Sequence, residues 1–424
     1  MTTAAQLLAH HLTALLQRPL PFRIRAWDGS SAGPAGAPTV VLRNRRALRR
    51  LLWQPGELGL ADAWISGDLD VEGDLAPALS QVRAALAGTG PVRPGLREWP
   101  ALLGAAARLG VLGPRPQPPG GRARVRGSLH SRARDRAVIS HHYDLSNEFY
   151  ALLLGEAMAY SCAYWTPKSD SLQTAQEAKF DLICRKLDLT PGSRLLDVGC
   201  GWGALAVHAA RHFGAQVTAV TLSQRQHAFA TAAVEAGGLT DQVSVLLRDY
   251  REIADGPFDA ISCIEMGEHV GDQQYPAFAR RLHSLLGPEG RLLVQQMSRS
   301  TVAPGGGAFI ETYIAPDMHM RPVGETVALL EHAGLEVRNV EALREHYART
   351  IDAWHERLDE HRAEFTALVG GPSVRLWQLY MAGSSLAFAE RRMGVDQILA
   401  IRPTTTGTSG APATPADWYQ GRAS

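Results

Sequence analysis

The sequence predicts an α/β protein: a doubly wound, mostly parallel sheet preceded by a small α+β domain. From about residue 137 to 402, segments with helical spacing alternate with short apolar strands, which is typical of βαβ units. At 193–203 one of those strands runs directly into a glycine-rich turn, and a helix follows. Residues at the N-terminus lack this alternation and place two short strands, at 21–27 and 38–44, among helical segments.

Changes in composition set the expected domain boundaries. Residues 1–110 form a separate N-terminal domain, and 111–136 form a basic linker rich in proline, glycine and arginine. The larger domain spans 137–402. Residues 403–424 have few hydrophobic side chains, so we expect a flexible tail there.

Within the larger domain the spacing predicts helices and strands in alternation. We expect helices at 171–189, 204–214 and 224–238. We expect strands from 193 into the glycine turn and at 216–223, 243–250, 258–266 and 290–298.

Composition and charge exclude several classes of protein. The chain has 424 residues, of which 45% are hydrophobic and 20% charged, so it can bury a sizeable core. A net charge of +1 gives no global field that would attract nucleic acid. The four cysteines (Cys162, Cys184, Cys200 and Cys263) form neither a disulfide framework nor a metal-binding pair, so we expect a reducing cytoplasmic compartment and no metal. No apolar run is long enough to span a membrane, which leaves any membrane contact to the protein surface.

The glycine turn, LLDVGCGWG at 195–203, is the most informative short motif. A buried strand delivers the chain to a turn in which side chains would block a ligand. The turn lacks the GxGxxG spacing that approaches a pyrophosphate, and the next strand ends without the acidic residue that dinucleotide sites use for the ribose. Asp197 stands beside the turn, where its carboxylate could hold the ammonium group of a methionine moiety. These observations favour S-adenosylmethionine (SAM), and they leave Gln226 or Thr221 to contact the ribose.

Seven segments, in order along the chain, resemble the cyclopropane-fatty-acyl-phospholipid synthase family. They are HHYDLSNEFYALLLGEAMAYSCAYW (141–165), LLDVGCGWG (195–203), VTLSQRQ (220–226), LLRDYRE (246–252), EHVG (268–271), FIETYIAP (309–316) and HYARTIDAWHERL (346–358). The resemblance covers 137–402 and implies the fold of class I SAM-dependent methyltransferases. The first hundred residues resemble the N-terminal accessory domain of the family's longer members.

The resemblance also implies which residues bind each part of SAM. From the methionine end to the adenine these are Tyr160 and Ser161, Gly199 and Gly201, Gln226, and Tyr250. In the family a bicarbonate ion is held by a cysteine, a glutamate, a histidine and a tyrosine. By motif the cysteine, glutamate and tyrosine are Cys162, Glu268 and Tyr347, but the histidine position holds Gln295.

Two departures from the family pattern alter the expected base. Gln295 can donate and accept hydrogen bonds but cannot carry a proton charge. Glu265 replaces a small residue in IEMGEHV (264–270) and adds a second carboxylate. That carboxylate either accepts a proton in the site or points away and is satisfied by a neighbour, and the sequence leaves both interpretations open.

The implied activity is transfer of a one-carbon unit from SAM to the cis double bond of an unsaturated phospholipid acyl chain, through a carbocation. Proton loss from the transferred methyl group closes a cyclopropane. A 1,2-hydride shift before proton loss leaves a mid-chain methylene, which a partner reductase could convert into a methyl branch. Since the base is altered, we favour the methylene. Aromatic side chains can stabilise the cation, and the candidates are Trp165, Tyr313, Tyr347 and Trp354.

Two other functions and the membrane partner stay open at this stage. The chain could methylate a small soluble amine, or it could be a lipid-binding protein that has lost catalysis. Between Arg115 and Arg136 there are seven arginines and one acidic residue, Asp135. This segment is either a solvated linker or a basic arm that meets anionic headgroups, where each arginine contributes about 1 kcal/mol. The second interpretation places a cytoplasmic protein at the inner face of the membrane. The oligomeric state stays open, a homo-oligomer included.

Overall fold

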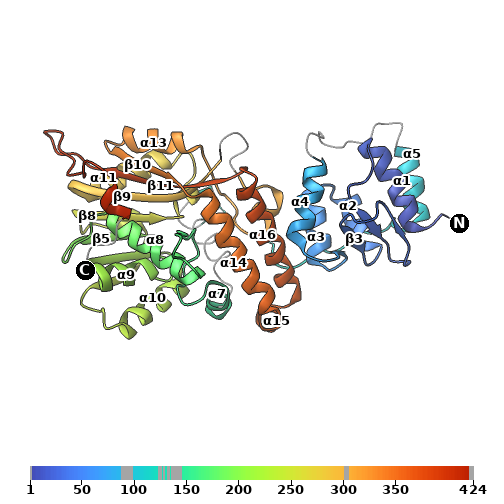
Figure 1. The fold of residues 1–424 in the computed structure, drawn as a ribbon, viewed down its shortest axis with the longest axis horizontal. Helices are drawn as coiled ribbons and strands as arrows, with labels where there is room; N and C mark the ends of the chain where they lie inside the picture. Colours follow the sequence, from blue (N-terminus) through green and yellow to red (C-terminus); the bar gives the residue numbers. More distant parts are fainter. Residues whose placement is uncertain are drawn as a thin grey trace. The chain divides into compact units, whose positions relative to one another are not determined.

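The computed structural model describes residues 2–86, 99–122, 127, 129–130, 134, 146–299 and 305–419 (Figure 1). The chain divides into two compact units, each built from more than one segment. The first unit contains Met1–Arg122, Ala308–Tyr313 and Arg362–Leu386, and the second contains Ala123–Gly307, Ile314–His361 and Ala387–Ser424.

Two segments of the expected domain 137–402 therefore belong to the first unit. Tyr313 is held there because its hydroxyl donates to Asp62 Oδ1 at 2.6 Å. Arg375 is held there because its Nε donates to the backbone oxygen of Trp64 at 2.6 Å. Such partners lie far apart in the sequence, so composition along the chain does not reveal them. Parts of the predicted linker and of the start of the larger domain lie outside the described residues: 123–126, 128, 131–133 and 135–145.

The first unit contains a four-stranded sheet of order β2-β1-β3-β4 and the helices around it. β1 pairs parallel with β3 and antiparallel with β2, and β4 pairs antiparallel with β3. β1 and β3 confirm the strands predicted near residues 21–27 and 38–44. The elements are α1 (Ala4–Leu16), β1 (Arg23–Arg25), β2 (Ser31–Ala32), β3 (Thr39–Leu42), α2 (Arg46–Trp53), α3 (Glu57–Ile65), β4 (Leu69–Val71), α4 (Leu75–Leu86), α5 (Trp99–Arg108), α12 (Ala308–Tyr313), α15 (Arg362–Val369) and most of α16 (Gly371–Ala389).

The second unit is built on a seven-stranded sheet of order β10-β11-β9-β8-β5-β6-β7. The neighbours from β7 to β9 pair parallel, and β11 runs antiparallel to both β9 and β10. The predicted α/β fold with a mostly parallel sheet is confirmed. The strands are β5 (Arg194–Val198), β6 (Gln216–Thr221), β7 (Val243–Leu247), β8 (Phe258–Ile264), β9 (Leu286–Ser298), β10 (Glu336–Ala342) and β11 (Gly394–Ile401).

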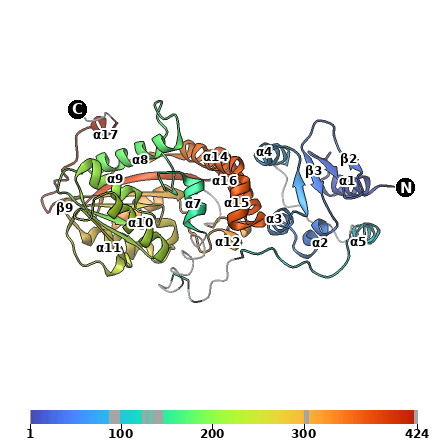
Figure 2. The same cartoon turned by 90° about the horizontal axis from the view of Figure 1, so that it is seen from below.

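Helices cover both faces of this sheet (Figure 2). Neighbouring residues of a strand point to opposite faces. Leu195 accordingly packs in the core shared with α8, α9 and α10, whereas Leu196 packs in the core shared with α11 and α13. Among the described residues no helix combines the length and apolar character needed to cross a membrane. The helices of this unit are α7 (Asn147–Leu154), α8 (Leu172–Lys186), α9 (Ala204–Phe213), α10 (Gln224–Ala236), α11 (Tyr275–Leu285), α13 (Val323–His332), α14 (Arg344–Glu360) and α17 (Ala416–Tyr419), with short 3-10 helices η1 (Tyr250–Glu252) and η2 (Gly267–His269).

Within the segment 403–424, for which the sequence predicts a flexible tail, Trp418 and Tyr419 contact residues of the sheet and of α8. The described part of this segment, up to residue 419, ends in α17. The indole of Trp418 is buried against Leu182 of α8 and Leu399 of β11. The Tyr419 hydroxyl donates to Glu341 Oε2 at 2.9 Å. The low average hydrophobicity of 403–424 does not predict this contact, because it is made by two aromatic residues in a segment that is otherwise mostly polar.

Candidate active site

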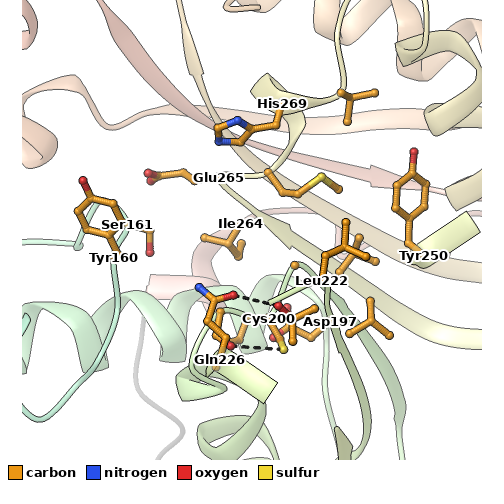
Figure 3. Close-up of a pocket in the computed structure, with 18 of the residues that line it drawn as sticks. Tyr160, Ser161, Asp197, Cys200, Leu222, Gln226, Tyr250, Ile264, Glu265 and His269 are labelled. Carbon is orange, nitrogen blue, oxygen red and sulfur yellow. Dashed lines mark hydrogen bonds between the residues drawn. The ribbon is translucent and has the colours of Figure 1, made fainter. Parts of the chain in front are cut away.

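A cavity lies at the edge of the second unit's sheet where β5, β6 and β8 end (Figure 3). Carboxyl ends of parallel strands meet at one edge of the sheet, which is where ligands bind in open α/β folds. The eight positions that the sequence assigns to SAM all line this one cavity: Tyr160, Ser161, Asp197, Gly199, Gly201, Thr221, Gln226 and Tyr250.

The glycine turn has a backbone that other residues would strain. Gly199 and Gly203 have φ angles of 77° and 84°, in the left-handed region that favours glycine. A Cβ at Gly203 would lie 2.9 Å from the Cβ of Ala230 on α10, so the close packing of turn and helix also depends on the missing side chain. α9 begins at Ala204, directly after the turn, and its N-terminal end faces the same edge.

Asp197 presents an unpaired carboxylate oxygen within the cavity wall. Its side chain is buried, and Oδ1 accepts a hydrogen bond from Ser262 Oγ at 2.8 Å. Oδ2 has no hydrogen-bond partner among the described residues. Burial raises the pKa of this carboxyl to about 6, against the opposing effects of Ser262 and of the Lys179 charge. A buried acceptor beside a glycine-rich turn fits the ammonium end of SAM.

Lys179 is a residue of the cavity that sequence reasoning missed. It lies on α8, is 1% exposed, and donates from Nζ to Ser161 Oγ at 2.7 Å. Burial lowers its pKa to about 8, although Glu265, Cys162 and Asp197 favour the charged form. Composition held a signal: the chain has only three lysines, and Lys179 and Lys186 are both buried. Buried lysines are rare unless they are paired.

The far part of the cavity holds the residues expected at the ribose and adenine. The Thr221 hydroxyl donates to Gln226 Oε1 at 2.9 Å, so both candidates for the ribose lie side by side. Tyr250 meets the ring of Phe278 edge-on, with ring centroids 5.4 Å apart. An aromatic ring at this position offers a flat apolar face of the kind that adenine stacks on.

Glu265 follows β8 directly and is held by three hydrogen-bond donors. Its Oε1 accepts from the backbone N–H of Cys162 at 2.7 Å and from Gln295 Nε2 at 2.8 Å. Its Oε2 accepts from the Tyr347 hydroxyl at 2.5 Å. Its φ of 52° is unusual for a residue with a side chain and is of the kind found where function imposes strain. The carboxylate is directed toward Tyr160 and Ser161 (Figure 3).

The donors to Glu265 belong to residues that the family resemblance assigns to the bicarbonate ion. Cys162 contributes its backbone N–H, while its Sγ donates to the backbone oxygen of Ala163, and burial raises the pKa of that thiol. Gln295 and Tyr347 contribute their side chains. Burial also raises the pKa of the Glu265 carboxyl, while its three hydrogen bonds and the Lys179 charge oppose that shift. Glu265 therefore does not point away from the cavity, its carboxylate is satisfied by neighbours, and its role as a proton acceptor stays a prediction.

Glu268 lies apart from this set. It belongs to η2 and is 0% exposed. Neither oxygen of its carboxylate has a hydrogen-bond partner of normal geometry among the described residues. Burial, and then the neighbouring Glu265, raise its pKa to about 8, so it is largely protonated at neutral pH. The expected grouping of Glu268 with Cys162 and Tyr347 is not seen as direct contacts.

The four aromatic candidates separate into two groups. Trp354 lies with its ring centroid 5.2 Å from that of Tyr160, a cavity residue, and 6.2 Å from that of Tyr347. None of the four candidates is among the described residues that line the cavity, and Tyr313 belongs to the first unit. Tyr160 lines the cavity, and the rings of Trp354 and, beyond it, Tyr347 lie behind Tyr160.

Comparison with known proteins identifies close similarity over the whole chain. Residues 130–398 match the family model described as mycolic acid cyclopropane synthetase. A probable fatty acid methyltransferase of Mycobacterium tuberculosis is 39% identical, and the alignment covers 99% of this chain and 100% of that protein. The tuberculostearic acid methyltransferase UfaA1 of the same organism is 30% identical over 95% of this chain and 92% of its own length.

A solved structure has a similar fold over about three fifths of this chain. The mycolic acid cyclopropane synthase CmaA1, in complex with SAH and CTAB, is 31% identical, with a TM-score of 0.59 over 62% of this chain and 97% of that one. SAH is the demethylated form of SAM, which supports SAM as the methyl donor here. The unpaired Asp197 oxygen and the glycine turn agree with that ligand.

We expect the affinity for SAM to fall about tenfold between pH 7 and pH 5. Asp197, whose pKa is about 6, must be ionised to hold an ammonium group, and one unit below its pKa only about a tenth of it is ionised. Titration calorimetry at the two pH values measures the effect. The Asp197→Asn variant is the control: it should bind weakly at pH 7 and lose the pH dependence. An affinity of the unmodified protein that does not change with pH would contradict this role of Asp197.

Proposed function

Since the chain belongs to the mycolic acid cyclopropane synthetase family and is a SAM-dependent methyltransferase, we propose that it transfers a one-carbon unit to the cis double bond of an unsaturated phospholipid acyl chain. The product that we propose is a mid-chain methylene, the precursor of a methyl branch, with a cyclopropane as the other outcome of the same chemistry. The observation that carries the proposal is the Glu265 carboxylate at the cavity, held by three donors. Similarity to proteins named fatty acid methyltransferase and tuberculostearic acid methyltransferase supports an acyl substrate.

Methyl transfer to an alkene needs alignment and a dry site. When bound, SAM supplies an electrophilic methyl group on a positively charged sulfur. The residues of the glycine turn, with Ser161 and Asp197, orient that end of the ligand, so that methyl and double bond approach to about 3–3.5 Å. The π electrons of the alkene would form the new carbon–carbon bond as the methyl–sulfur bond breaks. SAH would leave as a neutral thioether, and the positive charge would pass to the neighbouring chain carbon. The rings of Tyr160 and Trp354 stabilise this charge by about 2 kcal/mol if water is excluded.

Glu265 is the residue that we propose as the proton acceptor. Its Oε1 is engaged by two donors, whereas its Oε2 accepts from Tyr347 and keeps a lone pair for the proton. A hydride shift along the chain, followed by loss of a proton from the added carbon to Oε2, leaves the methylene. Loss of that proton without a shift closes the ring. Because the carboxylate is fixed by the fold, its position selects between these outcomes.

We further propose that Glu265 takes the place of bicarbonate as the base. Its carboxylate receives the hydrogen bonds of Cys162, Gln295 and Tyr347, the positions that the resemblance assigns to the ion. A carboxylate and a bicarbonate present the same pair of acceptor oxygens. Gln295 in place of the family's histidine is consistent with this exchange, because an amide N–H can hold a carboxylate without itself titrating.

The first test is the identity of the product. Full-length protein is incubated with SAM and vesicles of dioleoyl phosphatidylglycerol, and the acyl chains are then analysed by mass spectrometry and NMR. We expect chains heavier by one CH2 group with the vinylidene signals of an exocyclic methylene. A cyclopropane signal would show the same transfer with direct ring closure. Absence of added carbon, with SAM binding intact, would overturn the proposed substrate and direct the search to a soluble amine.

The second test removes the base and restores it. The Glu265→Gly variant should lose about 10²–10⁴-fold in rate, the usual contribution of a general base. Glycine also suits the positive φ at this position, so the fold should be retained. Added bicarbonate or formate should then recover part of the rate, since the space left by the side chain accepts a small carboxylate. The unmodified protein should not respond to bicarbonate.

The matched control is Glu265→Gln, which removes the charge but fills the space. It should be as slow as Glu265→Gly and should not be rescued by either anion. If Glu265→Gln kept the full rate, Glu265 would not be the proton acceptor. If the unmodified protein required added bicarbonate, the exchange of the ion for Glu265 would be refuted.

The membrane partner is a separate proposal. We propose that a reductase consumes the methylene product. We also propose that the arginine-rich segment 115–136 brings the protein to the anionic inner face of the membrane, where its acyl substrate is found. The support is the charge of the segment, seven arginines against one acid, of which Arg122 and Arg134 are already paired with Asp62 and Asp317. We expect co-sedimentation with phosphatidylglycerol vesicles that weakens as salt is raised from 0.05 to 0.5 M, since salt screens such contacts. Neutral phosphatidylcholine vesicles are the control, and binding that ignores salt would contradict an electrostatic contact.

A further inference from the structure

A row of buried polar side chains crosses the sheet from Glu265 to its far edge. Gln295 of β9 donates from Nε2 to Glu265 at 2.8 Å, and Gln397 of β11 donates from Nε2 to Gln295 Oε1 at 2.9 Å. Lys186 of α8 donates from Nζ to Gln397 Oε1 at 2.9 Å and to Glu341 Oε2 of β10 at 2.5 Å. Gln295, Gln397 and Lys186 are each 0% exposed.

The strand register builds this row. Gln295 is the direct partner of Gln397 between β9 and β11, and Gln397 is the direct partner of Glu341 between β11 and β10. On the other side, Gln295 pairs with Ile264, the residue before Glu265. Side chains at paired positions lie on the same face of a sheet. The row therefore lies on one face, the face that carries Lys186 of α8.

The row has only one consistent direction of hydrogen bonding. A lysine ammonium has donors and no acceptor, so Gln397 must turn its oxygen toward Lys186. Its NH2 group then faces Gln295, which must answer with its own oxygen. That leaves the NH2 group of Gln295 pointing at Glu265. The ammonium at the far end and the Glu265 carboxylate at the near end thus impose the same direction on both amides.

A structural role alone does not account for this arrangement. Burying amides and an ammonium costs free energy that an apolar row would not cost. Both amides could also turn by 180° if nothing fixed them, because their two ends are nearly the same size. In the turned state Gln295 would face Glu265 with its oxygen, and two acceptors would repel each other. Lys186, held by Glu341, excludes that state.

We propose that Lys186 and Gln397 are positioning residues of the methyl-transfer site, which orient Gln295 as a hydrogen-bond donor to Glu265 and so keep that carboxylate ready to accept a proton. This inference rests on the proposed role of Glu265 as the proton acceptor. Neither residue lines the cavity within the part of the chain that the structure describes. Their influence reaches the reaction only through Gln295.

Other groups also face Glu265 and set its baseline. They are Lys179 from α8, Tyr347 from α14, Glu268 from η2, and the thiol and backbone N–H of Cys162. Substitutions at Lys186 or Gln397 leave all of these in place. A change in the titration of Glu265 in such variants therefore reports on the row.

The decisive variant is Gln397→Glu, which keeps the shape and reverses the direction. A carboxylate there pairs with Lys186 and offers Gln295 only acceptors, so Gln295 must turn its NH2 group away from Glu265. Loss of that donor, together with the new negative charge, raises the pKa of Glu265. Since Glu265 works in its ionised form, we expect the acidic limb of the rate–pH profile to move upward by about one pH unit or more. The rate is that of methyl transfer to phosphatidylglycerol vesicles under saturating SAM.

The matched control is Gln397→Met, which keeps the volume and imposes no direction. Gln295 then remains able to donate to Glu265, so the limb should stay where it is in the unmodified protein, even if stability falls. The new charge alone would also move the limb of Gln397→Glu, so its contribution is measured as the shift that Gln397→Glu adds to Gln295→Met, which has no amide to turn. A purely structural role predicts the same shift on both backgrounds, whereas the positioning role predicts a larger shift where Gln295 is present. Thermal unfolding and SAM affinity are measured on each variant alongside.

The possible outcomes distinguish a failure of this inference from a failure of the proposed function. One outcome overturns the positioning role alone: the unmodified protein is active, Glu265→Gln is inactive, and the acidic limb of Gln397→Glu does not move. The proposed function then stands. If Glu265→Gln retains the full rate, the proposed base and this inference fall together. Should Gln397→Glu not fold, Gln397→Asp is used with the same readout. Its shorter carboxylate also offers Gln295 only acceptors, so its limb should also move upward, and an unmoved limb would overturn the positioning role.

Discussion

The cavity depends on how one carboxylate is held at the carboxyl end of β8. A buried carboxylate is costly unless several donors reach it, and Glu265 has three, from Cys162, Gln295 and Tyr347. These donors come from three separate parts of the second unit, so the carboxylate also joins the loop before α8, strand β9 and helix α14 at one point. Two opposing effects act on its pKa: burial raises it, and the hydrogen bonds lower it. The result is a carboxylate whose position is fixed by the fold.

Charged and titratable groups of both signs lie around this carboxylate. The positive charge of buried Lys179 lowers the pKa of both Asp197 and Glu265, and so favours the ionised form of each carboxyl group. Glu268 has no hydrogen-bond partner for its carboxylate among the described residues, and burial and Glu265 outweigh the opposing charge of Arg321, so its pKa is raised to about 8 and it is largely neutral. Asp197 has a pKa of about 6 and Glu268 one of about 8, while burial raises the pKa of Glu265 against its hydrogen bonds. That difference follows from which of them has a partner, in accord with the general rule that environment sets the role of each acid.

The two units use the same kind of interaction to gather distant segments. In the first, Asp62 receives the hydroxyl of Tyr313, so a motif from late in the sequence is part of the N-terminal unit. In the second, Glu341 receives both Lys186 and Tyr419, which ties α8, β10 and α17 together. Each case is a buried or half-buried carboxylate whose donors come from remote parts of the chain. Local composition, which predicted a contiguous domain and a flexible tail, does not contain this information.

The sequence by itself determined the class of fold, the strand that ends at the glycine turn and the positions that line the cavity, because periodicity and short motifs are local properties of the chain. It also singled out Glu265 and Gln295 as unusual. Only the tertiary structure decided what those two residues do: that the Glu265 carboxylate faces the cavity, that it receives the donors expected for a bicarbonate ion, and that Gln295 is oriented from across the sheet by Gln397 and Lys186. The physical reason is that hydrogen-bond direction depends on partners brought together by strand register and helix packing. Neither can be read from spacing along the chain.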